Sequence, residues 1–165
     1  GTSKRVFGEL LTWLNDKDSN IFIIATTNDI TNLPPELKRA GRFDRLYFID
    51  APNGRERVEI CRVMMRKYTR TAGADPAAIA GAADGNTGAE IEAAFSSALY
   101  TAYQDGEREP STDDIISALS EIVPIARAEA KQLDALKQWA KSNARTASTP
   151  DNAEAADDMK NDFSL

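Results

Sequence analysis

Residues 21–45 read IFIIATTNDITNLPPELKRAGRFDR, and this stretch decides the fold class. It opens with Ile21–Ala25, a short continuous run of apolar, β-favouring residues, and continues with the polar run Thr26–Asp29. A run of this kind predicts a strand that is buried on both faces of a parallel sheet. Ligands bind at the carboxyl ends of strands in such sheets, so the polar end of this strand is a candidate site.

The sequence around this strand alternates between helix and strand patterns. Ser3–Asn15 has apolar residues at helical spacing, with Ser3 as a candidate N-cap. Pro34 and Pro35 fit the first turn of a short helix that runs to about Ala40. Residues 45–49 predict a second strand, and the turn-forming run at 50–54 indicates a domain boundary.

Beyond that boundary the β-favouring runs stop, and the patterns are helical. Thr87 with Glu90 predicts a capping box. Asp75 is a further helix-start signal, as is either Ser111, three residues before Asp114, or Thr112, three residues before Ile115. The stretch from Thr146 onward is polar, acidic and poor in large apolar residues, which predicts a flexible tail. The expected helices cover about 53–69, 75–83, 87–104, 111–122 and 126–143, and the expected domains are 1–52, 53–145 and 146–165.

Composition excludes several classes of chemistry. The net charge is −6, which disfavours binding along nucleic acid or anionic lipid. The chain has no histidine and one cysteine, Cys61, so a disulfide, a cysteine zinc site or an imidazole-based triad is not expected. No apolar run approaches the roughly 20 residues of a membrane helix, and we expect a soluble protein of the cytoplasm.

The stretch from Ile21 to Arg45 resembles the second region of homology of the AAA+ ATPases, in which a strand ending in Asn precedes a Pro-containing helix and a Gly-Arg-Phe-Asp segment. By this resemblance Asn28 stands at the sensor 1 position. A neutral amide there would act on the γ-phosphate or orient the attacking water. A lone Asn would more simply cap the following turn, but the surrounding match favours the sensor role.

The same resemblance assigns Arg39 and Arg42 to the two arginine-finger positions, which reach the ATP site of the neighbouring subunit. Arginine suits this task because its planar fork makes permanently charged, bidentate contacts to phosphate. Two arginines three residues apart are otherwise ordinary solvated side chains. The chain has Ala40 where the family usually has Pro.

The helical half resembles the small lid domain of the family. Thr87–Glu92, TGAEIE, is similar to the start of the lid's third helix, where Gly88 and Ala89 would face the adenine and ribose. Ala89 and Ile91 leave no sensor 2 arginine in this motif. The stretch 122–148 is most similar to stand-alone AAA proteins of bacteria and plastids, and the plastid stroma is then a second expected location. The implied fold is a partial three-layer α/β unit of the P-loop NTPase type, followed by an all-α lid.

The motifs that would complete an ATP site are not in these 165 residues. No G-x-x-x-x-G-K-[ST] loop and no acidic strand for magnesium occur in them, so we expect no metal ligands and no ATP turnover by this chain alone. The resemblance implies ATP and Mg²⁺ as cofactors of the complete protein, a hexameric ring and remodelling of an unknown protein substrate. Two alternatives are a non-catalytic interaction module, which intact Asn28, Arg39 and Arg42 disfavour, and a clamp-loader-like DNA-associated protein, which the acidity disfavours.

Overall fold

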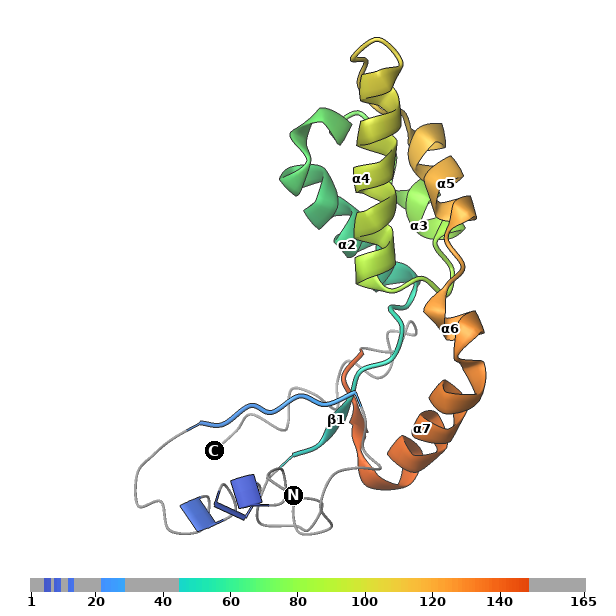
Figure 1. Cartoon of the computed structure of the whole chain (residues 1–165). Helices are drawn as coiled ribbons and strands as arrows, with labels where there is room; N and C mark the ends of the chain where they lie inside the picture. Colours follow the sequence, from blue (N-terminus) through green and yellow to red (C-terminus); the bar gives the residue numbers. More distant parts are fainter. Residues whose placement is uncertain (1–4, 7, 10–11, 14–21, 29–44, 149–165) are drawn as a thin grey trace.

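The computed structural model describes residues 5–6, 8–9, 12–13, 22–28 and 45–148. The described part is mostly helical, with one small parallel sheet (Figure 1). Its elements in chain order are β1 (Tyr47–Phe48), α2 (Gly54–Lys67), η1 (Thr69–Thr71), α3 (Pro76–Ala82), α4 (Gly88–Gln104), α5 (Thr112–Glu121), α6 (Ile125–Ala128), α7 (Ala130–Asn143) and β2 (Arg145–Thr146).

The helices α2 to α5, residues 54–121, form the helical unit, and side chains fix where several of them begin. Asn53, Thr87 and Ser111 each accept the N–H of the residue three positions on, and the acidic side chain at that position returns a hydrogen bond. Such capping boxes satisfy backbone donors that a helix start leaves unpaired. At α3, Asp75 caps the N–H of Ala77 and Pro76 occupies the first helical position.

One hydrophobic core holds the helical unit together. α4 packs against α2 and α5, and α3 packs against α2 and α5. The largest fully buried apolar side chains are those of Phe95, Ile79, Ile91 and Ile115. Small residues on α4 (Ala94, Ala98 and Ala102) are also buried and allow the helices to approach closely. Cys61 is fully buried in this core, and its burial raises the pKa of the thiol to about 11.

The small sheet joins two segments that are far apart in the sequence. β2 lies parallel to β1, with Tyr47 opposite Arg145 and Phe48 opposite Thr146. The N–H of Arg145 donates to Leu46 O at 2.9 Å, and the N–H of Ala147 donates to Phe48 O at 2.9 Å. The expected tail, residues 146–165, therefore begins inside β2, and its residues 149–165 lie outside the described residues.

The expected helix bounds agree with the structure to within one or two residues from α2 to α5. Residues 5–6, 8–9 and 12–13 are helical, in agreement with the helix expected at 3–15. One expected helix, 126–143, is instead two, because the chain breaks at Glu129, where φ is −114°. The surrounding residues are exposed, so no buried apolar contact keeps the helix continuous there.

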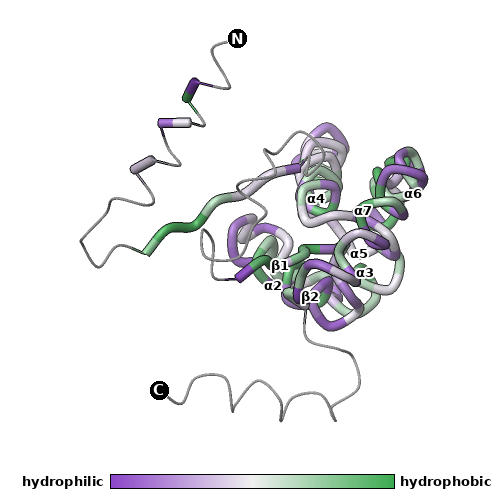
Figure 2. Tube along the Cα trace, turned by 90° about the horizontal axis from the view of Figure 1, so that it is seen from below, coloured by the Kyte–Doolittle hydropathy of each residue, from purple (hydrophilic) through white to green (hydrophobic). Residues whose placement is uncertain are grey.

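The strand expected at Ile21–Ala25 is wrong for its described residues, 22–25, which form neither helix nor strand. Phe22 is 89% exposed and Ile24 is 77% exposed. A strand of a parallel sheet requires partners on its edges and cover on its faces, and the described residues supply neither to this segment. Figure 2 shows the segment as a hydrophobic stretch outside the packed helices.

The predicted fold class is confirmed. The described residues combine an all-α unit with a parallel strand pair, in which β1 comes before the unit in the chain and β2 comes after it. The expected short helix ending near Ala40 lies outside the described residues. Within the described part of the chain, no helix is both long and apolar enough to cross a membrane.

Candidate functional site

The start of α4 is the best-defined part of the candidate site. The chain reverses after α3 through Gly85, whose φ of +79° favours glycine, and the N–H of Asn86 bonds to Ala83 O at 3.0 Å. Thr87 is the N-cap, with extended backbone angles, and its Oγ1 accepts the N–H of Glu90 at 3.3 Å. The turn and the cap therefore fix the position and direction of the N-terminus of α4.

Glu90 uses both carboxylate oxygens at this point. Oε2 accepts the N–H of Thr87 at 2.7 Å and its hydroxyl at 2.9 Å, while Oε1 accepts the N–H of Ile125 at 2.7 Å. Burial raises the pKa of Glu90, but the hydrogen bonds from Thr87 and Ile125 outweigh it and hold the pKa below its ordinary value. The carboxylate is thus kept ionised as a structural acceptor.

Gly88 and Ala89 occupy the first two positions of α4. Ala89 is exposed and Gly88 is half-buried. A Cβ on Gly88 would meet only the side chain of Ile60, at 3.7 Å, which is an ordinary contact. The site is therefore not so tight that glycine is required. The helix N-terminus carries partial positive charge and can receive an anionic or polar group.

Arg57 of α2 holds the loop that leads into this helix. Its guanidinium donates to Ala80 O at 2.9 Å and to Pro52 O at 3.0 Å, and it lies 3.1 Å from the carboxylate of Asp84. The Arg57 side chain is only 13% exposed. One largely covered cation therefore fixes the end of α3 relative to the chain before α2. The sequence did not single out Arg57, because α2 carries several arginines at similar spacing.

Asn86, which precedes the N-cap, was also missed. It is 3% exposed, and its Nδ2 is the buried side-chain atom without a hydrogen-bond partner among the described residues. A buried amide nitrogen in this state is uncommon in folded proteins. The only sequence signal was its place directly before the capping threonine.

The structure does not bring Asn28 together with the start of α4. Asn28 is exposed and lies at a bend that ends the segment 22–28. That segment runs below the helical unit, on the side of β1 (Figure 1). Arg39 and Arg42 lie outside the described residues.

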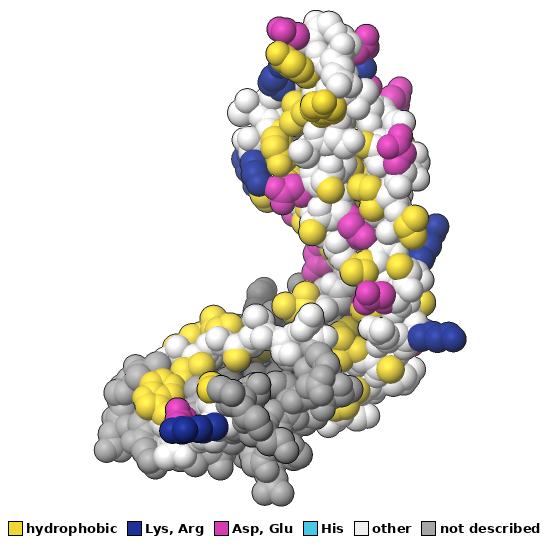
Figure 3. Space-filling view, viewed as in Figure 1, with side chains coloured by type: hydrophobic (Ala, Val, Ile, Leu, Met, Phe, Trp, Pro, Cys, Tyr) yellow, Lys and Arg dark blue, Asp and Glu magenta, His cyan; other side chains and the backbone are white. Residues whose placement is uncertain are grey.

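The electrostatics of the described surface are mixed. Figure 3 shows acidic and basic side chains scattered along the helical unit, without a broad patch of one sign on that face. Among the described residues, no group of three or more Cys, Asp or Glu side chains is arranged to hold a metal ion.

Sequence comparison matches the first part of the chain to a protein family. Residues 1–51 match the profile of the AAA family, described as the ATPase family associated with various cellular activities. The match covers the stretch that contains Asn28, Arg39 and Arg42. The resemblance inferred from the sequence is therefore confirmed, and the chain is related to the AAA+ ATPases.

Individual relatives extend the similarity through the helical unit. An uncharacterized AAA domain-containing protein ycf46 of Guillardia theta is 39% identical over 142 residues, which is 85% of this chain and 28% of the relative. The protein of the same name from Pyropia yezoensis is 40% identical over 151 residues, 90% of this chain and 30% of the relative. A proteasome-activating nucleotidase of Aeropyrum pernix is 34% identical over 121 residues, 72% of this chain and 30% of the relative. The chain thus spans less than a third of the length of each of these relatives.

Proposed function

We propose that this chain is part of an AAA+ ATPase that hydrolyses ATP at the subunit interfaces of a ring. The ring is hexameric by family resemblance, and the energy of hydrolysis is used to remodel a protein substrate. The observation that carries the proposal is the pairing of AAA-family sequence at residues 1–51 with a lid-like helical unit whose α4 begins at the capped motif Thr87–Glu90. The proposed division is an α/β part at 1–52, a lid at 53–145 and a tail at 146–165, in the cytoplasm or a plastid stroma.

Gly88 and Ala89 are the residues that would lie beside the adenine and ribose of ATP. They fit this task because they are small, lie in the first turn of a 17-residue helix and leave Ala89 open to solvent. ATP with Mg²⁺ supplies the phosphoryl group and the cation that neutralises phosphate charge. We propose no Mg²⁺ ligand in this chain, because its sequence has no apolar strand that ends in paired acidic residues.

Asn28 is proposed to act on the γ-phosphate or on the attacking water. Its support is the match of residues 1–51 to the AAA family together with the exposure of Asn28, which lies at the bend that ends the segment 22–28. Arg39 and Arg42 are proposed to stabilise transition-state charge in the site of the neighbouring subunit. The three residues would then serve hydrolysis, whereas Gly88 and Ala89 would serve binding.

The test is steady-state kinetics on the longer protein that contains this chain. Asn28→Ala should lower kcat by about tenfold or more and leave ATP affinity nearly unchanged, because the amide is not a binding group for adenine. Thr26→Ala, two residues earlier in the same polar run, is the matched control and should retain wild-type turnover. Wild-type kcat in the Asn28 variant would contradict the sensor role.

A further inference from the structure

The segment that follows the helical unit returns to β1 and pairs with it. Residues 122–148, here called the strap, comprise α6, α7 and β2 and lead from the end of α5 back to β1 (Figure 1, orange to red). The strap thus runs alongside the junction, residues 49–53, which is the direct covalent link between β1 and α2. Two connections therefore join the helical unit to β1.

The upper end of the strap is attached to the start of α4. The N–H of Ile125, the first residue of α6, donates to Glu90 Oε1 at 2.7 Å. The other oxygen of Glu90 closes the capping box of α4. A displacement of the start of α4 would therefore be transmitted to the strap through the carboxylate of Glu90.

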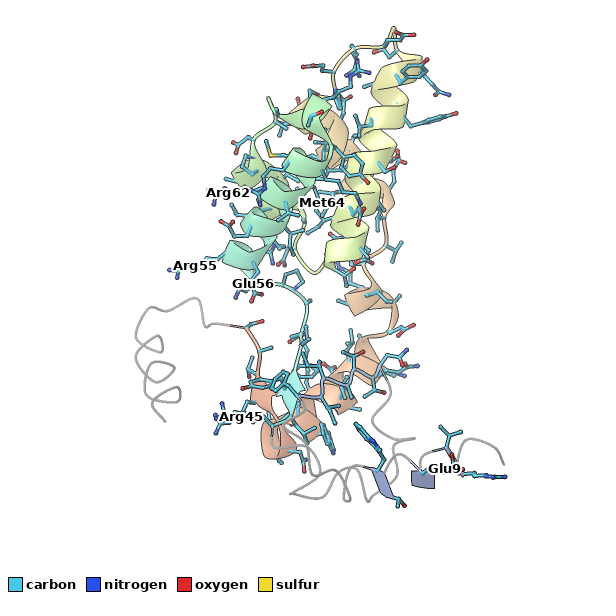
Figure 4. All side chains as sticks on the ribbon, turned by 90° about the vertical axis from the view of Figure 1, so that its left-hand side faces the viewer. Glu9, Arg45, Arg55, Glu56, Arg62 and Met64 are labelled. Atoms are coloured by element: carbon cyan, nitrogen blue, oxygen red, sulfur yellow. The ribbon has the colours of Figure 1, made fainter. Side chains whose placement is uncertain are left out.

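The lower end of the strap is attached on both sides of the junction. β2 pairs with β1, which precedes the junction, and Lys137 Nζ lies 2.9 Å from Asp50 Oδ2 in it. Beyond the junction, the hydroxyl of Ser148 donates to Glu56 Oε2 at 3.2 Å. Glu56 is the capping-box glutamate of α2, and Figure 4 shows it at the lower end of that helix.

We propose that the strap is a conformational tether that fixes the angle between the helical unit and β1 and couples that angle to the start of α4. A short junction by itself leaves rotation of the two parts as the default. The strap opposes this rotation because it holds both sides of the junction, and its ends reach the capping glutamates of α4 and α2. Its contacts are individually weak and partly exposed, so the tether is releasable.

Two pairs of variants distinguish an effect on the tether from an effect on the folding of the helical unit. Ile125→Pro removes the N–H that Glu90 accepts, and the change suits the backbone because proline is favoured at the first helical position and Pro124 has ψ of 133°. Ile125→Ala keeps the N–H and is its control. Lys137→Ala removes the ion pair with Asp50, and Lys137→Arg keeps the charge.

The readout is the distribution of distances between spin labels at Ile49→Cys and Tyr103→Cys in the 165-residue chain. Both positions are exposed, at 75% and 56%; Ile49 is the residue directly after β1, where the junction begins, and Tyr103 lies in α4 of the helical unit. Cys61 does not compete for label, because its thiol is buried and has a raised pKa. Helical content by circular dichroism accompanies each measurement to confirm that the helical unit is folded.

The tether predicts one narrow distribution for the parent chain, Ile125→Ala and Lys137→Arg. It predicts a measurably broader distribution in Ile125→Pro and in Lys137→Ala, with helical content retained. Equally narrow distributions in all five proteins would overturn the proposal, because the angle would then not depend on the strap. A distance distribution in the parent chain that is as broad as the distributions in Ile125→Pro and Lys137→Ala would overturn it as well.

Discussion

Glu90 and Ile125 are joined by a 2.7 Å hydrogen bond from the backbone N–H of Ile125 to Glu90 Oε1, although the two residues lie 35 positions apart in the chain. The same carboxylate receives the N–H and the hydroxyl of Thr87. One side chain therefore orders the start of α4 and anchors the chain that leaves α5.

Replacing Glu90 should destabilise the helical unit. Glu90→Ala removes a capping box and leaves the N–H of Ile125 without this acceptor, so we expect a loss of about 1–2 kcal/mol in the free energy of unfolding. Urea unfolding followed by circular dichroism measures it. Glu121→Ala, at the exposed end of α5, is the control and should leave the midpoint unchanged. Equal midpoints for the two variants would show that Glu90 has no such role.

Acid should weaken the start of α5. Asp114 receives Arg108 Nη1 at 2.6 Å and Nη2 at 2.8 Å, and it also closes the capping box with Ser111. The Arg108 guanidinium, followed by the N–H of Ser111, holds the pKa of Asp114 well below its ordinary value. Because the folded pKa lies below the unfolded value of about 3.9, this stabilisation is present above that pH and is lost as the pH falls toward the folded pKa.

The measurement is the thermal midpoint of the chain between about pH 6 and pH 2, a range that brackets the unfolded pKa. Asp114→Asn should have a lower midpoint at pH 6 and a shallower decline toward pH 2 than the parent chain. Asp113→Asn, at the adjacent exposed position, should keep the parent slope. A parent-like slope in Asp114→Asn would show that another group controls the acid response.

Local chemistry made the helical unit predictable. Thr87 and Ser111 gave helix starts that differ from the structure by one residue, because a capping side chain acts within three residues of its own position. β2 was not predicted, because Arg145–Thr146 has no strand pattern of its own and pairs only where β1 offers its carbonyl groups. The strand expected at 21–25 was wrong for its described residues for the converse reason: its pattern is strong, but the described residues offer it no strand partner.

The same distinction applies to the candidate site. Gly88 and Ala89 were recognisable because the motif around them is contiguous. Arg57 was not, because Arg55 and Arg62 occupy the same helix and project away from the unit (Figure 4). Only the fold shows that Arg57 is the arginine whose side chain is 13% exposed. Asn86 was not recognised for a similar reason, since its 3% exposure is a property of the folded chain.

Nucleotide binding by the 165-residue chain should be weak. Neutral contacts at Gly88 and Ala89 do not replace a phosphate-binding loop, and no G-x-x-x-x-G-K-[ST] sequence occurs among these residues. Titration calorimetry with ATP and Mg²⁺ should therefore detect little or no binding, and a phosphate-release assay should detect no turnover. Submicromolar affinity or measurable turnover would contradict this expectation.

The action of Arg39 and Arg42 across a subunit interface is the central proposal, and substitution of either in the longer protein should reduce kcat by roughly 10³–10⁵ while ATP still binds. The most direct measurement mixes an Arg42→Ala subunit with a subunit that lacks the lysine of its phosphate-binding loop but keeps both arginines. Each is inactive alone, and a mixed ring places an intact arginine against an intact phosphate site at some interfaces. ATPase activity should reappear on mixing. Verified subunit exchange and normal assembly without any return of activity would contradict action in trans.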